Sequence, residues 1–200
     1  MTGILQTGER MPAVATQRGL TAEEFWQQYA GRPYELVRGE VKQRMPVGLW
    51  HGILAGELVA RFREHLKRRP EQVGKLAVET GFRVRTALGE SVRAPDVAFI
   101  RAERLPSPLP HTFADLAPDL VVEIASPNDA YSELRDKVDE WLQAGVQMVW
   151  VVDPQRRVVE VYQPDQPLRV LREGDTLTGD PVLPDFQLPI SELFAEISEE

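Results

Sequence analysis

Two apolar runs separated by a segment of helical periodicity most constrain how this chain folds. The runs are DLVVEIA, which begins at Asp119, and QMVWVVD, which ends at Asp153. Continuous runs of β-branched and aliphatic residues are typical of strands buried on both faces of a sheet. The segment between them is long enough for a right-handed crossover connecting parallel strands. The sequence therefore predicts an α/β (α+β mixed) fold with a central mixed β-sheet flanked by helices.

One carboxylate interrupts the first of these runs. Glu123 stands between the apolar residues LVV and IA, where a turn has no place. Burying an unpaired carboxylate costs several kcal/mol, so the side chain must be neutralised, find a partner or bind a cation. The strand therefore suggests a functional residue rather than a purely structural one.

Other segments predict helices and additional β-hairpins around this unit. Thr21 and Glu24 form a capping-box pattern that opens a short helix ending at Tyr29. Hairpins are indicated by YELVRGEVKQR, turning at Arg38-Gly39, and by RRVVEVYQ with PLRVLRE. Further helices are expected over about 50–68, over about 130–144 with Gly145 as a left-handed C-cap, and at SELFAEI. KLAVETGFRVR and VRAPDVAFI look like two strands joined at LGE.

Length and composition suit one compact domain over residues 1–200. At this size and with 42% hydrophobic residues, the chain can bury roughly 70% of its unfolded surface. We expect a body over 20–172, with its core at about 50–153, and an acidic C-terminal segment over 173–200. The absence of cysteine fits a reducing compartment, and neither a signal peptide nor a membrane span is apparent. We therefore expect a cytoplasmic protein without a membrane partner.

The net charge of −8 is unevenly distributed. Residues 173–200 contain eight acidic residues and no Lys or Arg, which leaves 23 acidic and 23 basic residues over 1–172. Positive charge gathers in RFREHLKRRPEQVGK and FRVR. This pattern indicates either a solvated helix face or a phosphate-binding patch.

Two carboxylates and a lysine are candidates for one site. Asp96 follows Pro95 at the start of VAFI. If its strand neighbours that of Glu123, the two carboxylates could bind a hard cation such as Mg²⁺. The alternative is that Asp96 is a turn aspartate with a structural role. A site of this kind also needs a lysine to orient the attacking water or to balance charge in the transition state. The strand would most simply supply it two residues beyond Glu123, on the same face, but that position is Ala125. Lys137 lies at the border of the apolar face of the next helix; its alternative is a surface pair with Glu133.

In their order and spacing, these motifs resemble the PD-(D/E)XK nuclease superfamily. The closest likeness is to a bacterial restriction-endonuclease branch of Uma type, in which the catalytic lysine has migrated to the following helix. It runs from about Tyr34 to Tyr162 through YELVRGEV, WHGIL, ETGFRV, VRAPDVAFI, DLVVEIASPND, Asp136-Lys137 and AGVQMVWVVDP. The resemblance implies a restriction-endonuclease-like core.

The resemblance also implies roles for individual residues. Asp96 and Glu123 would be metal ligands for Mg²⁺ or Mn²⁺, and Lys137 would be the catalytic lysine. His51, near the start of the long helix, would have an auxiliary catalytic role, with a core or capping histidine as the alternative. Family members commonly have Tyr at the position of Trp141, which is also a large aromatic residue.

Glu35 and Glu79 are read as structural. The implied activity is metal-dependent hydrolysis of DNA phosphodiester bonds, and a homodimer is compatible with it. The alternatives are a non-catalytic protein of nuclease fold that binds a partner or nucleic acid, and a phosphodiesterase acting on RNA.

Overall fold

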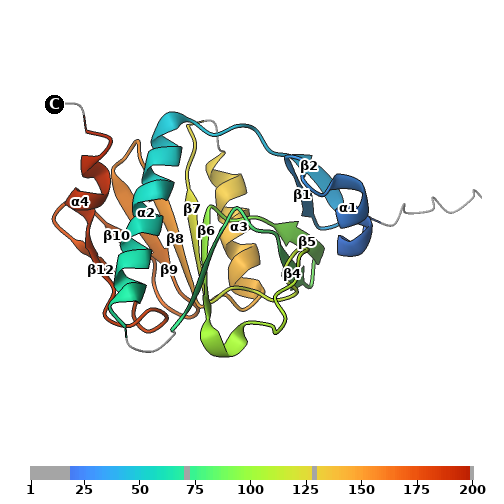
Figure 1. Cartoon of the computed structure of the whole chain (residues 1–200). Coiled ribbons are helices and arrows are strands. Elements are labelled where there is room, and N and C mark those ends of the chain that lie inside the picture. Colours follow the sequence, from blue (N-terminus) through green and yellow to red (C-terminus); the bar gives the residue numbers. More distant parts are fainter. Residues whose placement is uncertain (1–18, 70–72, 128–129, 199–200) are drawn as a thin grey trace, which may run out of the picture.

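A six-stranded mixed sheet forms the centre of the computed structural model, which describes residues 19–69, 73–127 and 130–198 (Figure 1). Its strand order is β10-β9-β8-β7-β6-β3. Strands β7 and β8 are parallel, and the other neighbouring pairs are antiparallel. The predicted mixed sheet and crossover are therefore confirmed. The strands are β3 (Gly74–Val78), β6 (Val97–Arg101), β7 (Leu120–Ile124), β8 (Met148–Asp153), β9 (Val158–Tyr162) and β10 (Arg169–Leu171).

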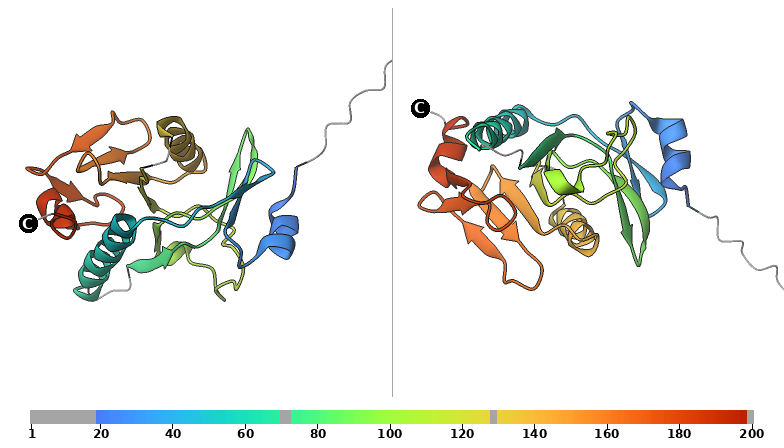
Figure 2. Two further views of the ribbon diagram at one scale, coloured as in Figure 1. Left: turned by 90° about the horizontal axis from the view of Figure 1, so that it is seen from above. Right: turned by 60° about the horizontal axis from the view of Figure 1, so that its bottom comes forward.

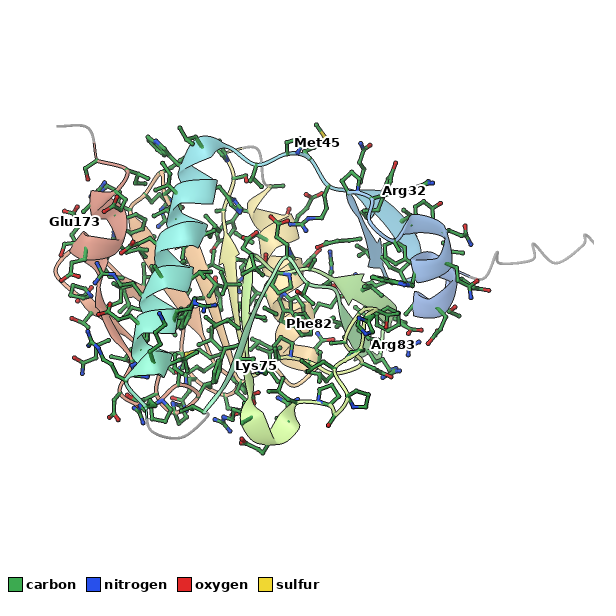
Figure 3. The ribbon with its side chains drawn as sticks, viewed as in Figure 1. Arg32, Met45, Lys75, Phe82, Arg83 and Glu173 are labelled. Atoms are coloured by element: carbon green, nitrogen blue, oxygen red, sulfur yellow. The ribbon has the colours of Figure 1, made fainter. Side chains whose placement is uncertain are left out.

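Two helices cover the opposite faces of this sheet. Helix α2 (Leu49–Lys67) lies on one side and α3 (Tyr131–Gln143) on the other, as Figure 2 shows from above. Under α2, Phe62 stacks on Trp150 of β8 with ring centroids 5.5 Å apart. Under α3, the buried Val138 and Trp141 share an apolar cluster with Val121 of β7 and Val149 of β8. Trp141 also meets Phe82, labelled in Figure 3, edge to face. The sheet is thus buried on both faces, as its apolar strands predict.

Gly145 ends α3 in the predicted left-handed conformation, with φ of 94°. At the other end of α3 the N-cap is Ala130. Asn128 and Asp129, which end the DLVVEIASPND motif, lie outside the described residues. None of the helices within the described ranges is long and apolar enough to span a bilayer.

A second, four-stranded antiparallel sheet stands at one end of the molecule. Its order is β2-β1-β5-β4, and α1 (Ala22–Tyr29) packs beside it. The capping box at Thr21 and the turn at Arg38-Gly39 are confirmed; both turn residues have positive φ. The strands are β1 (Tyr34–Val37), β2 (Glu40–Gln43), β4 (Phe82–Thr86) and β5 (Gly89–Arg93).

The prediction of two long strands joined at LGE was wrong in one respect. Each long strand is broken in the middle, and its halves belong to different sheets: β3 and β4 on one side of LGE, β5 and β6 on the other. Glu79 breaks the first with a φ of 46°. Pro95 breaks the second, because proline offers no N–H to a ladder and restricts the residue before it. Asp96 consequently stands where the chain enters the main sheet.

The acidic C-terminal segment packs on the α2 side. It forms β11 (Thr176–Thr178), β12 (Gln187–Pro189) and α4 (Ile190–Ala195). Elsewhere in the chain, a 3-10 turn, η1 (Ala102–Arg104), follows β6 and precedes the long loop before β7. Phe186 stacks on Phe62 with centroids 4.9 Å apart. Arg61 and Arg69 of the basic stretch pair with Glu192 and Asp185 of this segment at 2.9 Å and 2.6 Å. The segment is thus joined to α2 by both apolar and ionic contacts.

Phe186→Ala should lower the free energy of unfolding by about 3–5 kcal/mol, the usual cost of deleting a buried aromatic ring. The ring is buried against Phe62 and Trp150. Urea denaturation followed by tryptophan fluorescence measures the change. Leu88→Ala, at a residue 60% exposed in the β4–β5 turn, is the control and should stay near wild type. A Phe186→Ala effect as small as the control's would show that the segment contributes little to the core.

Candidate active site

The structure brings Asp96 and Glu123 together at one end of the main sheet. Strands β6 and β7 are antiparallel, with Val97 paired to Val122, so Asp96 and Glu123 stand opposite each other one residue further on. Asp96 Oδ2 accepts a hydrogen bond of 2.6 Å from the backbone N–H of Ile124. The two predicted carboxylates therefore lie on neighbouring strands, as expected for a shared site.

Helix α3 supplies a partner to each oxygen of Glu123. The Lys137 ammonium lies 2.7 Å from Oε2, and the Trp141 indole N–H donates to Oε1 at 2.8 Å. Lys137 and Trp141 are four residues apart, about one helical turn, and so share a face of α3. Glu123 itself is 3% exposed. The carboxylate that interrupts this apolar strand is thus fully partnered by one helix.

Lys137 reaches the site from the border of the buried face of α3. Among the described residues its ion pairs are with Glu123, at 2.7 Å, and Glu35, at 3.9 Å, rather than with Glu133 on its own helix. Burial lowers the pKa of this ammonium, but the charges of Glu123 and Glu35 raise it more, so the net pKa lies above its usual value. Lys137 is therefore held in the charged form next to Glu123.

His51 approaches Asp96 from the first turn of α2. Its Nε2 lies 3.0 Å from Asp96 Oδ1, and the ring is buried. With the hydrogen on Nε2, the imidazole donates to the carboxylate; Nδ1 is buried and has no hydrogen-bond partner among the described residues. Two donors, from His51 and Ile124, thus fix the orientation of the Asp96 carboxylate.

The second sheet contributes Glu35, which the sequence had suggested to be structural. Its Oε1 accepts the backbone N–H of Ala94 at 3.0 Å, and its Oε2 lies 3.2 Å from Arg93 Nη1. Lys137 Nζ is 3.9 Å from Oε1. Glu35 therefore contacts both the segment that leads into Asp96 and the candidate catalytic lysine.

A buried network continues from Glu35 beneath the site. The Arg93 guanidinium also donates to Glu140 at 2.8 Å and 2.5 Å, and the Ser91 hydroxyl donates to the other oxygen of Glu140. Sequence reasoning missed these residues. The available signal was spacing: Arg93 stands three residues before Asp96, and Glu140 follows Lys137 by three residues on α3.

Glu79 does not bring its side chain into this cluster. The residue is exposed at the break between β3 and β4, and its backbone N–H lies 3.4 Å from the carbonyl oxygen of Asp96. Its contact with the site is made by the main chain.

The carboxylates of the cluster respond differently to burial. Burial raises the pKa of Glu123 to about 7; the Lys137 ammonium opposes this effect, and the Asp96 charge adds to it. Burial also raises the pKa of Asp96 and of Glu35, but their partners outweigh it. Asp96 accepts hydrogen bonds from His51 and from the Ile124 N–H, and Glu35 faces the charges of Lys137 and Arg93, so both pKa values lie below their usual range. Of these three carboxylates, Glu123 is thus the one whose pKa lies above its usual range.

The donor set fits a hard divalent cation. Asp96 and Glu123 offer carboxylate oxygens, and each oxygen keeps a lone pair beyond the hydrogen bond it already accepts. Within the described ranges no group of three or more His, Asp or Glu side chains surrounds a common point. Mg²⁺ is usually held by one or two carboxylates, with water and substrate phosphate completing its shell, so these two residues suffice for it.

Comparison with known proteins identifies the family. The model of the Uma2 family, described as "Putative restriction endonuclease", matches residues 22–191. This chain belongs to the Uma2 family. A solved "putative nuclease belonging to DUF820" from Anabaena variabilis has a similar fold: the TM-score is 0.78 at 24% identity, covering 90% of this chain and 99% of that one. No curated protein matches the chain. The resemblance to the restriction-endonuclease branch and the nuclease-like fold are therefore confirmed.

The raised pKa of Glu123 predicts a pH dependence of stability without divalent cations. A carboxyl with a raised folded-state pKa contributes stability below its unfolded value of 4.5 and loses it as the pH rises through about 7. Between these pH values the wild type should lose on the order of 3 kcal/mol relative to Glu123→Gln. Denaturation in chelator at several pH values measures the difference. If the free energy of unfolding of the two proteins changed in parallel with pH, the pKa of Glu123 would not be raised in the folded protein.

Proposed function

We propose that this Uma2-family protein is a Mg²⁺- or Mn²⁺-dependent endonuclease that hydrolyses DNA phosphodiester bonds. The observation that carries the proposal is the placement of the Lys137 ammonium on Glu123, beside Asp96, at one end of the sheet. Two carboxylates and a lysine form a site where a cation-bound phosphodiester can be attacked by water. Membership of a restriction-endonuclease-like family supports the same reaction class.

Asp96 and Glu123 would hold the cation through their carboxylate oxygens. A bound divalent cation supplies Lewis acidity at the phosphate and lowers the pKa of coordinated water. Asp96 is the better oriented of the two ligands, because His51 and the Ile124 N–H fix its carboxylate. His51 would act as an orienting partner of Asp96 in this arrangement.

Lys137 would orient the attacking water and stabilise the charge that develops on the phosphate oxygens. Preorganised donors aimed at developing charge commonly contribute about 10²–10³-fold in rate. The ammonium is held on the end of a long side chain that emerges from α3, and its charged form is favoured by two carboxylates. It is therefore available as a donor at neutral pH.

Glu35 would position both halves of the site. Its carboxylate accepts the N–H of Ala94, two residues before Asp96, and faces the Lys137 ammonium at 3.9 Å. Arg93 holds the other Glu35 oxygen. In this role Glu35 acts through its neighbours and does not itself touch the substrate.

Cleavage of supercoiled plasmid DNA with Mg²⁺ or Mn²⁺ tests the proposed activity. Asp96→Ala should abolish cleavage because the cation loses a ligand, and Lys137→Ala should slow it by about 10²–10³-fold. Glu196→Gln, which removes an exposed charge at the end of α4 away from the site, is the control and should cleave like wild type.

Equal activity in all four proteins would show that these residues do not form the active site. If none of them cuts DNA, the alternatives return: an RNA phosphodiesterase, tested with RNA in the same assay, or a non-catalytic protein. The acidic net charge and the pairing of Arg83 and Arg85 with Asp115 favour the non-catalytic alternative. Homodimerisation stays a prediction.

Glu35→Gln should lower kcat by roughly tenfold or more while leaving KM within about twofold. The amide can still accept the Ala94 N–H, but the charge opposite Lys137 is lost, so positioning suffers more than binding. Steady-state kinetics on a short duplex separates the two constants, and Glu35→Asp should restore part of kcat. Unchanged kcat in Glu35→Gln would return Glu35 to a purely structural role.

A further inference from the structure

A second buried glutamate, Glu160, lies on the same face of the main sheet as Glu123. In the register of the sheet Glu123 of β7 pairs with Val151 of β8, and Val151 pairs with Glu160 of β9. Paired residues on adjacent strands point to the same face, and adjacent strands are about 4.8 Å apart. The backbones at Glu123 and Glu160 are therefore separated by roughly 10 Å along one row across the sheet.

A cavity of about 180 Å³ opens between this row and the first turns of α3. Its walls combine small or apolar side chains with polar ones, including Ala125, Ser126, Tyr131, Leu134, Val151 and Glu160. Ala125 lies two residues beyond Glu123 on the same strand face. The cavity is therefore a neighbour of the candidate active site and separate from its metal-binding carboxylates.

Glu160 brings hydrogen-bonding capacity into the cavity wall. It is 4% exposed; Oε2 accepts the Tyr162 hydroxyl at 2.5 Å, and Oε1 lies 3.4 Å from Arg156 Nη1. A carboxylate offers about four lone-pair positions, so two contacts leave room for a further donor. The side chain can therefore accept a hydrogen bond from a ligand without losing either neighbour.

The volume of the cavity limits its occupant to a small group. Pockets for drug-sized ligands enclose roughly 300–1,000 Å³, so this cavity suits a single ring system. Leu134 and Val151 offer apolar walls to the faces of a ring, and Tyr131, 56% exposed, lies at the rim where an aromatic ring can stack. A nucleobase combines flat apolar faces with polar edges and matches these walls.

We propose that this cavity is a nucleobase subsite that receives the base of a nucleotide next to the scissile phosphate. Glu160 accepts a hydrogen bond from an exocyclic amino group, so bases that carry one, such as cytosine, are preferred over thymine, which offers a carbonyl oxygen there. The base enters unstacked from its neighbours, as in enzymes that extrude a base from the duplex. The subsite rests on the proposed nuclease function for its substrate, but base binding can be measured without cleavage.

Equilibrium binding of fluorescent single strands of deoxycytidine or thymidine tests the subsite. Anisotropy is measured with Ca²⁺, and gel electrophoresis verifies that the strands stay intact. The wild type should favour oligo-dC by roughly three- to tenfold, the range that one net hydrogen bond gives. Glu160→Gln should bring the ratio close to one, because an amide presents both a donor and an acceptor.

Two further variants guard against misfolding and simple charge effects. Tyr131→Ala alters an exposed side chain and should weaken oligo-dC binding several-fold through lost stacking. Glu196→Gln removes the same charge as Glu160→Gln at the end of α4, which packs on the α2 side of the sheet, and should keep the wild-type ratio. A wild type without base preference, a Glu160→Gln protein that keeps the preference, or a Tyr131→Ala protein with unchanged affinity would overturn the subsite.

The binding and cleavage assays fail independently. A Glu160-dependent base preference without DNA cleavage would support the subsite and overturn the nuclease function. Cleavage that needs Asp96 and Lys137, without such a preference, would overturn the subsite alone.

Discussion

The ion pair between Lys137 of α3 and Glu123 of β7 is the contact on which the candidate site depends. A carboxylate buried in an apolar sheet is costly unless both oxygens find partners, and α3 supplies both from one turn, through Lys137 and Trp141. Because α3 directly follows β7 in the chain, the connection between them sets which helical face meets the strand. The lysine can therefore stand on the helix while Ala125 occupies the strand position.

The second sheet completes the site because the chain crosses between sheets next to it. Pro95 ends β5 and leads into β6, so Asp96 occupies the crossing point rather than the middle of a continuous strand. Glu35 of β1 accepts the Ala94 N–H there and meets Arg93. The position of Asp96 thus depends on both sheets. A hairpin that looks peripheral in Figure 1 contributes a buried carboxylate to the candidate site.

Local patterns predicted most of the fold and part of the site. Apolar runs and helical periodicity sufficed for β7, α3 and β8, and the phase of α3 placed Lys137 at the edge of its buried face. The broken strands escaped prediction because strand-like residues stand on both sides of Glu79 and Pro95 in the sequence, while the sheet to which each half belongs is determined by pairing with distant segments. Glu35 escaped for the same reason: its partner Ala94 lies 59 residues away.

Charge balance explains why a cation suits this site better than further basic residues. Arg93 pairs with both Glu35 and Glu140, and Lys137 pairs with both Glu35 and Glu123. Each of these two cations is therefore shared between two carboxylates. Arg44 lies 3.9 Å from Glu35 and 4.0 Å from Asp96. Burial, which the Lys137 ammonium only partly opposes, raises the pKa of Glu123 to about 7. Elsewhere Arg83 already contacts Glu23, Glu90 and Asp115. A divalent cation held by Asp96 and Glu123, as proposed, would add two positive charges beside the carboxylate whose pKa is raised.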